Sequence, residues 1–184
     1  IAKRIPSRMM VAADGPDFCQ PECIDAVFLK HLQDKAATIT GNTVIVLHQI
    51  GSHGPSYWLR YPPERETFTP ACKTPELTEC STEEIVNAYD NTIAYTDHFL
   101  TQVIDLLDQQ PRVVPAMFYV SDHGESLGEA GMYLHGTPYF MAPEYQTHVP
   151  MVIWMSDRFR ATLGMDGACL AKGTGETVSH DNMF

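Results

Sequence analysis

Residues 116–129 read AMFYVSDHGESLGE, an apolar run that ends abruptly in an aspartate, a histidine and a glycine. The run predicts a buried parallel strand, because such strands are apolar on both faces and open a ligand crevice at their carboxyl ends. Asp122 and His123 follow directly, and a carboxylate with an imidazole suits Zn²⁺. Gly124 lets the backbone turn, so both side chains can serve one site. A plain Asp-His-Gly turn is the alternative, and the cost of burying both groups unpaired favours metal ligation.

Two further histidines lie in glycine-containing loops. Residues 43–48 are β-branched and apolar, which predicts a second buried parallel strand, and His53 follows it between two glycines. Parallel strands present their carboxyl ends at one edge of a sheet, so we expect His53 beside Asp122 and His123. We interpret His53 and His135 as contacts for a substrate phosphate or for a second metal.

The remaining pattern predicts helices and one more strand. Apolar residues recur at helical spacing over 24–36 and over 85–107, and residues 81–84 (STEE) form a capping box before the second helix. Residues 149–155 predict a strand with a proline near its start. The unit 43–121 therefore predicts a right-handed strand–helix–strand crossover, which indicates an α/β fold.

Five cysteines form an informative pattern. Cys19 and Cys23 are four residues apart, and Cys72 and Cys80 are eight apart in a segment rich in proline and threonine. Free thiols or a metal site are alternatives, although neither pair has the spacing of a zinc ribbon. We expect two local disulfides, which imply an oxidising compartment such as a bacterial periplasm. Cys169 is left over, as a free buried thiol or with a partner outside the chain.

Length, composition and charge narrow the class of protein. The chain has 184 residues, about the size of one domain, and its hydrophobic fraction of 44% is enough for a packed core and does not suggest disorder. Its net charge of −11 argues against nucleic-acid binding, although Lys3, Arg4, Arg8, Arg60 and Arg65 could meet anionic groups. No apolar run approaches the roughly 18 residues of a membrane span. The first residue is not methionine, so we expect a processed or excised piece.

Several motifs together resemble one family. The motifs are LHQIGSHGP at 47–55, RY at 60–61, FTP at 68–70, YDNT at 89–92, SDHGESLGE at 121–129, YLHG at 133–136, AP at 142–143 and VP at 149–150. In concert they are similar to the lipid A phosphoethanolamine transferases, which include the colistin-resistance enzymes. These enzymes belong to the alkaline phosphatase/sulfatase-like superfamily.

The resemblance implies a fold, a reaction and a location. The fold is an α/β three-layer sandwich with a central, mostly parallel sheet. The reaction is a zinc-dependent transfer of phosphoethanolamine from phosphatidylethanolamine to a lipid A phosphate through a covalent threonine intermediate, which gives polymyxin resistance. By motif, Asp122 and His123 match two zinc ligands, and His53 and His135 match histidines that hold the phosphoethanolamine group or a second zinc. The implied location is the periplasmic face of the bacterial inner membrane.

Several parts of the family pattern have no match in this chain, because in the family they lie upstream of these motifs. They include the nucleophilic threonine, an acidic zinc ligand, a lysine near the substrate and the membrane helices. We therefore expect residues 1–184 to be one domain, a fragment of the periplasmic catalytic domain that lacks its N-terminal part and its last strands. Membrane contact is expected through a missing N-terminal transmembrane domain. No threonine in the chain can be assigned as the nucleophile, so we expect the piece alone to be inactive and to bind zinc weakly.

Two competing interpretations stay open. One is another metal-dependent enzyme of the same superfamily, such as a sulfatase, a phosphodiesterase or a phosphoglycerol transferase. The other is a non-catalytic zinc-binding module that has lost its nucleophile. Glu125 could support the metal ligands, and His180, next to Asp181, could orient a group in the site.

Overall fold

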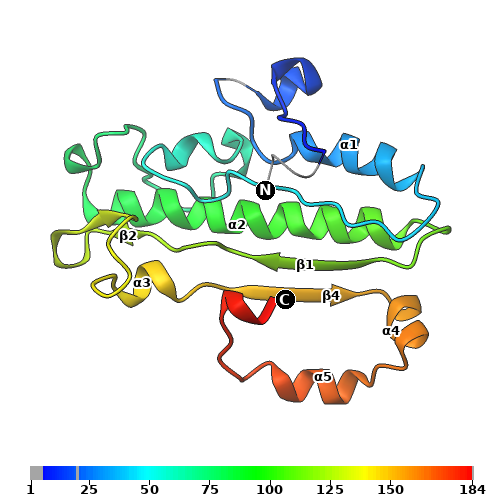
Figure 1. Ribbon diagram of the computed structural model, residues 1–184. Coiled ribbons are helices and arrows are strands. Elements are labelled where there is room, and N and C mark those ends of the chain that lie inside the picture. The colour runs from blue at the N-terminus through cyan, green and yellow to red at the C-terminus, as the bar shows by residue number, and fades with distance from the viewer. Residues whose placement is uncertain (1–5, 20, 184) are drawn as a thin grey trace.

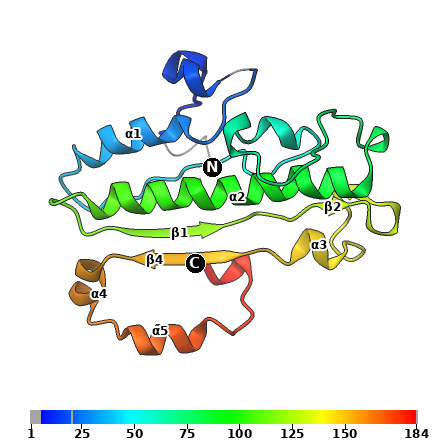
Figure 2. The ribbon, with the colours of Figure 1, turned by 180° about the vertical axis from the view of Figure 1, so that it is seen from behind.

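A computed structural model describes residues 6–19 and 21–183, so Lys3 and Arg4 lie outside the described residues. Two helices, α1 (Val27–Ala36) and α2 (Thr82–Asp108), lie side by side against a layer of extended chain (Figures 1 and 2). Strands β1 (Ala116–Val120) and β4 (Met151–Met155) belong to that layer. Both predicted helices are confirmed, and so are both of these strands, although β1 was predicted to be buried and its five residues are exposed or half-buried.

Helix α2 begins at the predicted capping box. The Ser81 hydroxyl accepts a hydrogen bond from the Glu84 N–H, and the Glu84 carboxylate accepts one from the Ser81 N–H at 2.7 Å. These bonds satisfy two backbone donors that the first helical turn leaves free. The helix then runs for 27 residues and buries one apolar face, which makes it the main support of the fold.

The core consists of two clusters at the two ends of α2. One cluster centres on Leu32, Phe99 and Val103, which join α1 to α2 and receive side chains from the extended layer. The other cluster lies beneath the histidine loops and is formed by Tyr57, Cys72, Leu77, Ile85, Ala88 and Leu127. The second cluster fixes the loops that carry the candidate site.

The predicted parallel pairing is not found among the described residues. Strand β1 pairs with β4 in antiparallel register, Ala116 opposite Met155, because the chain turns back through 121–150 and returns along β1. A second antiparallel pair joins β2 (Ser126–Leu127) to β3 (Tyr133–Leu134). Residues 43–48 are not a paired strand, so the predicted strand is wrong in that respect. Their backbone makes no hydrogen bond to another backbone group within the described ranges, and a strand requires such a partner.

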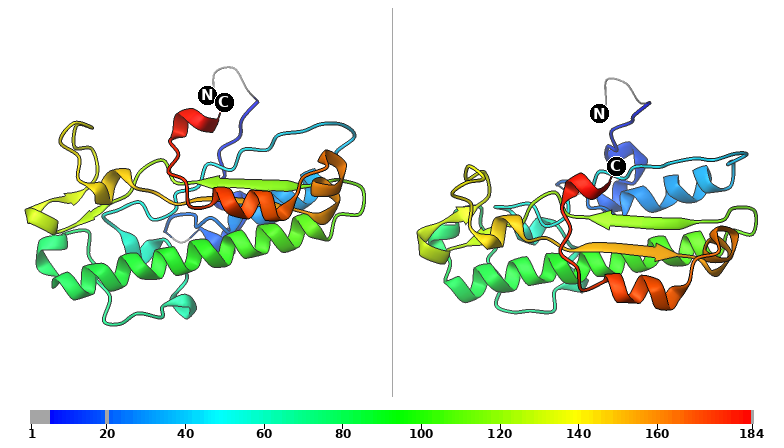
Figure 3. Two further views of the ribbon diagram at one scale, coloured as in Figure 1. Left: turned by 90° about the horizontal axis from the view of Figure 1, so that it is seen from below. Right: turned by 60° about the horizontal axis from the view of Figure 1, so that its bottom comes forward.

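The rest of the chain is short helices and turns. The excursion over 56–80 contains three turns of 3₁₀-helix, and residues 137–146, predicted as irregular, end in the short helix α3 (Glu144–Thr147). Helices α4 (Asp157–Leu163) and α5 (Gly167–Gly173) follow β4, and Figure 3 shows the C-terminal segment crossing back over the strands. Among the described residues, no helix combines the length and apolar character needed to cross a membrane.

Both predicted disulfides are confirmed. Cys19 is bonded to Cys23, and Cys72 to Cys80. Cys169 is a free thiol, as one alternative held, but it is exposed rather than buried. Cys72 also belongs to the core cluster beneath the histidine loops, so its disulfide ties the 56–80 excursion to that core.

Replacing Cys72 and Cys80 together by alanine is expected to lower the free energy of unfolding by about 2–3 kcal/mol, because the open chain gains entropy when unfolded. Urea denaturation monitored by far-ultraviolet circular dichroism measures the change. The matched control is Cys169→Ala, which removes an exposed free thiol and is expected to change the free energy by less than about 0.5 kcal/mol. A double variant as stable as the control would contradict a stabilising role for this disulfide.

Candidate active site

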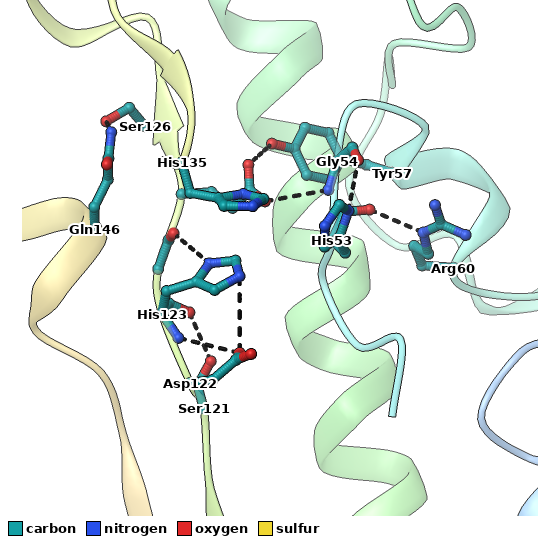
Figure 4. A network of polar contacts seen from close by, with 12 residues as sticks. His53, Gly54, Tyr57, Arg60, Ser121, Asp122, His123, Ser126, His135 and Gln146 are labelled. Atoms are coloured by element: carbon teal, nitrogen blue, oxygen red, sulfur yellow. Dashed lines mark hydrogen bonds and ion pairs between the residues drawn. The ribbon is translucent and has the colours of Figure 1, made fainter. Parts of the chain in front are cut away.

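Three histidine rings converge at one end of the layer of extended chain (Figure 4). His53 comes from the loop after residues 43–48, His123 follows β1, and His135 follows β3. The ring centroids of His123 and His135 are 3.9 Å apart and the rings stack, while His53 lies edge-on to His135 at 4.9 Å and to His123 at 6.1 Å. The structure thus brings together three residues that are up to 82 positions apart, the difference between 53 and 135.

Each of these histidines is oriented by an oxygen atom next to its Nδ1. The Nδ1 of His53 lies 2.7 Å from the Gly54 carbonyl, and that of His123 lies 3.0 Å from the Gly124 carbonyl. A carbonyl oxygen can only accept, so in both bonds Nδ1 carries the proton. In a neutral ring the lone pair is then on Nε2. Metal-binding histidines are held in this way, with one nitrogen donating to a backbone oxygen and the other free for the ion.

Asp122 lies at the solvent side of the histidine cluster. Its side chain is 80% exposed, and its Oδ1 is 3.8 Å from the Nε2 of His123. Ligand atoms at zinc bond lengths of about 2.0–2.2 Å are roughly 3.4 Å apart in a tetrahedral site. The observed separation is somewhat longer than that spacing, and the ligand pair Asp122 and His123 stays a prediction.

Glu125 is the buried centre of the polar network around the histidines. Its Oε1 lies 3.0 Å from the Nδ1 of His135 and accepts the Gly54 N–H at 3.3 Å, and its Oε2 accepts the Tyr57 hydroxyl at 2.9 Å. Among the described residues, ligand atoms of His123, Glu125 and His135 lie within 4.8 Å of one another, so this trio could also hold a metal ion. Since three donors already occupy the carboxylate, its better-supported role is to orient His135 and the His53 loop.

Tyr57 and Arg60 hold the His53 loop in place. Burial raises the pKa of the Tyr57 phenol, and the neighbouring Glu125 carboxylate raises that pKa further, so Tyr57 remains a hydrogen-bond donor. Arg60 is buried, donates from Nε to the His53 carbonyl at 2.9 Å and pairs with Glu22. The anionic group that Arg60 meets is thus the Glu22 carboxylate, inside the protein.

Asp25 anchors the loop that carries His53, and the sequence analysis did not predict this role. Its carboxylate is buried and accepts the N–H groups of Ile50 and Gly51 at 3.0 and 3.1 Å. Burial raises the pKa of Asp25 above its usual range, and the two N–H donors counteract that rise. A lone aspartate ahead of a helix carries no pattern that points to a partner 25 residues away.

The turn after β1 is fixed by close packing. A Cβ atom at Gly124 would lie 2.1 Å from the Tyr145 carbonyl oxygen, so no larger residue fits there. The Gly124 N–H donates to the Gln146 carbonyl at 3.0 Å, and the Gln146 amide donates to the buried Ser126 hydroxyl at 2.9 Å. The glycine therefore serves a close approach of two chain segments rather than the sharp turn that the sequence suggested.

His180 approaches the site from the C-terminal segment, with its Nε2 2.8 Å from the Ser121 carbonyl. It contacts the backbone one residue before Asp122, and its role in orienting a group of the site stays a prediction. His148, in contrast, is exposed and lies 3.4 Å from Glu144 on the same short helical turn. The structure therefore distinguishes the three converging histidines from histidines outside the cluster, such as His148.

The chain is similar to several known proteins. A family model described as "Sulfatase" matches residues 6–184. The phosphoethanolamine transferase EptA of Salmonella typhimurium is 45% identical over 184 residues, which cover 98% of this chain and 34% of that protein. The chain thus spans about a third of the length of the curated relatives it matches most fully.

Two solved structures from Neisseria meningitidis are also similar. The soluble domain of lipooligosaccharide phosphoethanolamine transferase A is 42% identical with a TM-score of 0.93, over 98% of this chain and 55% of that one. The integral membrane form of the same transferase is 41% identical with a TM-score of 0.90, over 96% of this chain and 33% of that one. The predicted α/β fold is confirmed by these likenesses.

Proposed function

The chain belongs to the sulfatase family, and from that membership we propose that it forms part of a zinc-dependent phosphoethanolamine transferase acting on lipid A. The observation that carries the proposal is the convergence of three imidazoles whose Nδ1 atoms are each held by an oxygen. That arrangement stands in a chain 45% identical to a phosphoethanolamine transferase. The overall activity of the longer relatives is proposed for this chain only as part of such an enzyme.

In this proposal Asp122 and His123 hold the zinc ion. Bound Zn²⁺ supplies positive charge that stabilises phosphoryl oxygens. His53 and His135 lie beside that position and offer Nε2 atoms that can bind the phosphoethanolamine group, or a second zinc. The buried Glu125 carboxylate keeps His135 in the required tautomer.

The donor would be phosphatidylethanolamine and the acceptor a phosphate of lipid A. A threonine outside residues 1–184 would accept the group as a covalent intermediate, which splits one difficult step into two easier ones. The two disulfides agree with a periplasmic location at the inner membrane. Modified lipid A carries less negative charge and would bind polymyxins less tightly, which is the expected cellular effect.

A hybrid enzyme tests this function directly. The matching third of Escherichia coli EptA, which is 44% identical, is replaced by residues 1–184, and lipid A from cells expressing the hybrid is analysed by mass spectrometry. We expect phosphoethanolamine-modified lipid A, and a loss of about 100-fold or more with His135→Ala, because a group that positions the substrate is removed. The matched control is His148→Ala, an exposed histidine outside the cluster.

The same hybrid separates the proposal from its alternatives. A hybrid that is made in normal amounts, leaves lipid A unmodified and hydrolyses aryl sulfates would favour a sulfatase. A hybrid that binds zinc but catalyses neither reaction would favour a non-catalytic zinc-binding module. Either result would overturn the assignment as a phosphoethanolamine transferase.

A further inference from the structure

The peptide unit between His53 and Gly54 is held at both of its ends. Its carbonyl accepts a hydrogen bond from the Nε of Arg60 at 2.9 Å, and its N–H donates to the buried Glu125 carboxylate at 3.3 Å. A trans peptide is planar and its C=O and N–H point in opposite directions, so these two bonds together fix its orientation. Figure 4 shows Arg60 on one side of this peptide and His135 on the other.

The orientation of this peptide sets that of the His53 ring. The ring Nδ1 donates to the Gly54 carbonyl at 2.7 Å, so the imidazole is tied to the backbone that directly follows the peptide. The Nδ1 atoms of His123 and His135 are held by other oxygen atoms. Loss of the bond from Arg60 would therefore turn the His53 ring and leave the other two rings in place.

Arg60 depends on a carboxylate to stay in this position. Its side chain is only 6% exposed and carries a permanent positive charge, and a buried charge is costly unless it is paired. The partner is Glu22, whose carboxylate accepts a hydrogen bond from the Nη1 of Arg60. Without that carboxylate the guanidinium would have to turn toward water, and its bond to the His53 carbonyl would be lost.

Glu22 lies inside the smaller of the two disulfide loops. Cys19 and Cys23 are bonded at a sequence separation of four and face each other in an antiparallel bridge. A half-exposed side chain normally loses conformational entropy when it holds an ion pair, which makes such pairs weak. The disulfide restricts the backbone that carries Glu22, so less entropy remains to be lost when Glu22 binds Arg60.

The same short part of the chain holds the His53 loop at a second point. Asp25, which follows the disulfide loop, accepts the N–H groups of Ile50 and Gly51 at 3.0 and 3.1 Å. These two residues lie where the His53 loop begins, whereas Glu22 acts at the histidine itself. The disulfide loop and Asp25 therefore hold both the start of the His53 loop and its functional residue.

We propose that Glu22 is a positioning residue for His53 that acts through Arg60, and that the Cys19–Cys23 disulfide holds Glu22 in this role. The consequence for catalysis rests on the proposed function, in which His53 binds the phosphoethanolamine group or a second zinc. The alternative is an ion pair that only stabilises the fold. Such a pair would contribute to the free energy of unfolding, but its loss would leave the orientation of the His53 ring unchanged.

NMR signals of the histidine rings test the coupling directly. The protein is the Neisseria soluble domain in which the matching segment is replaced by residues 1–184, and each ring signal is assigned by replacing that histidine. Glu22→Ala is expected to shift the His53 signal and to leave those of the other two clustered rings in place. Glu22→Gln, which keeps an acceptor oxygen, is expected to shift it less. The matched control is Asp157→Ala, which removes an exposed partner of Arg160 and should shift none of the three signals.

The role of the disulfide is tested in the same hybrid domain. Replacing Cys19 and Cys23 together by serine is expected to shift the His53 signal in the direction that Glu22→Ala does, because the carboxylate is no longer held. Adding Glu22→Ala to this double variant is expected to cause little further shift, since both changes act on one contact and their effects are not additive.

The consequence for the reaction is measured in the hybrid EptA enzyme. Glu22→Ala is expected to lower its turnover number about tenfold, because a misplaced group binds the substrate in a less productive position. In a His53→Ala background the same change is expected to cause no further loss, because the residue through which Glu22 acts is gone.

Three results would overturn the proposal. They are an unmoved His53 signal in the folded Glu22→Ala variant, equal shifts of all three clustered rings, and a loss of turnover that is as large in the His53→Ala background as in its absence. The ring signals require no transferase activity, so they decide the proposal even if the proposed function is wrong. The turnover measurements decide it if the hybrid soluble domain does not fold.

Discussion

Replacing Asp122 by asparagine is expected to weaken zinc binding by the hybrid EptA enzyme about 100-fold or more, whereas Glu125→Gln weakens it about tenfold. The Asp122→Asn change keeps the size of the side chain but removes the negative charge beside the Nε2 of His123, 3.8 Å away. Glu125 already accepts from three donors, so its loss acts through the orientation of His135. The comparison decides between the two carboxylates that lie near His123.

Zinc retention measured against a competing chelator, at fixed pH and chelator concentration, gives both affinities. The matched control is Glu144→Gln, since Glu144 and His148 are an exposed carboxylate–imidazole pair 3.4 Å apart that should contribute nothing. A larger loss for Glu125→Gln than for Asp122→Asn would transfer the ligand role to Glu125. Equal, small losses of zinc affinity for both variants would show that zinc does not bind at this position.

Helices and extended segments could be predicted from the sequence more accurately than the pairing between strands. Helix α2 could be predicted because a capping box and a long apolar stripe act within one segment. The apolar run at 43–48 correctly indicated extended chain, but pairing depends on a partner that local pattern does not reveal. The antiparallel pairing of β4 with β1 could not be predicted either, because the direction of β4 is set by the path of residues 121–150.

The candidate site was likewise predicted only in part. The histidines were found because each follows a strand or lies in a glycine-containing loop, where polar side chains can converge. Their supports were missed or left open. Asp25, Tyr57 and Glu125 act across separations of 25 to 71 residues, and nothing in their local sequence marks the partner. The sequence motifs therefore located the candidate site, and only three-dimensional contacts explain how its side chains are held in place.

The largest effect on stability is expected at Asn91, which is fully buried on α2. Its Oδ1 accepts the N–H groups of Thr67 and Phe68 at 2.7 and 2.8 Å, and its Nδ2 donates to the Phe68 carbonyl at 2.9 Å. One side chain thus satisfies three backbone groups of the 56–80 excursion. Asn91→Ala would leave them without partners, and we expect the free energy of unfolding to fall by about 3–5 kcal/mol.

Asn87, one turn earlier on α2, is the matched control for this change. It donates a single hydrogen bond, at 2.8 Å, to the Pro70 carbonyl of the same excursion, in an exposed setting. Asn87→Ala is therefore expected to cost about 1 kcal/mol, because water can replace the lost donor. Urea denaturation of both variants measures the difference, and similar losses would show that the buried network of Asn91 does not hold the excursion on the helix. Since Tyr57 lies in that excursion and supports Glu125, the Asn91 variant should also loosen the histidine loops, seen as faster exchange of the Gly54 amide.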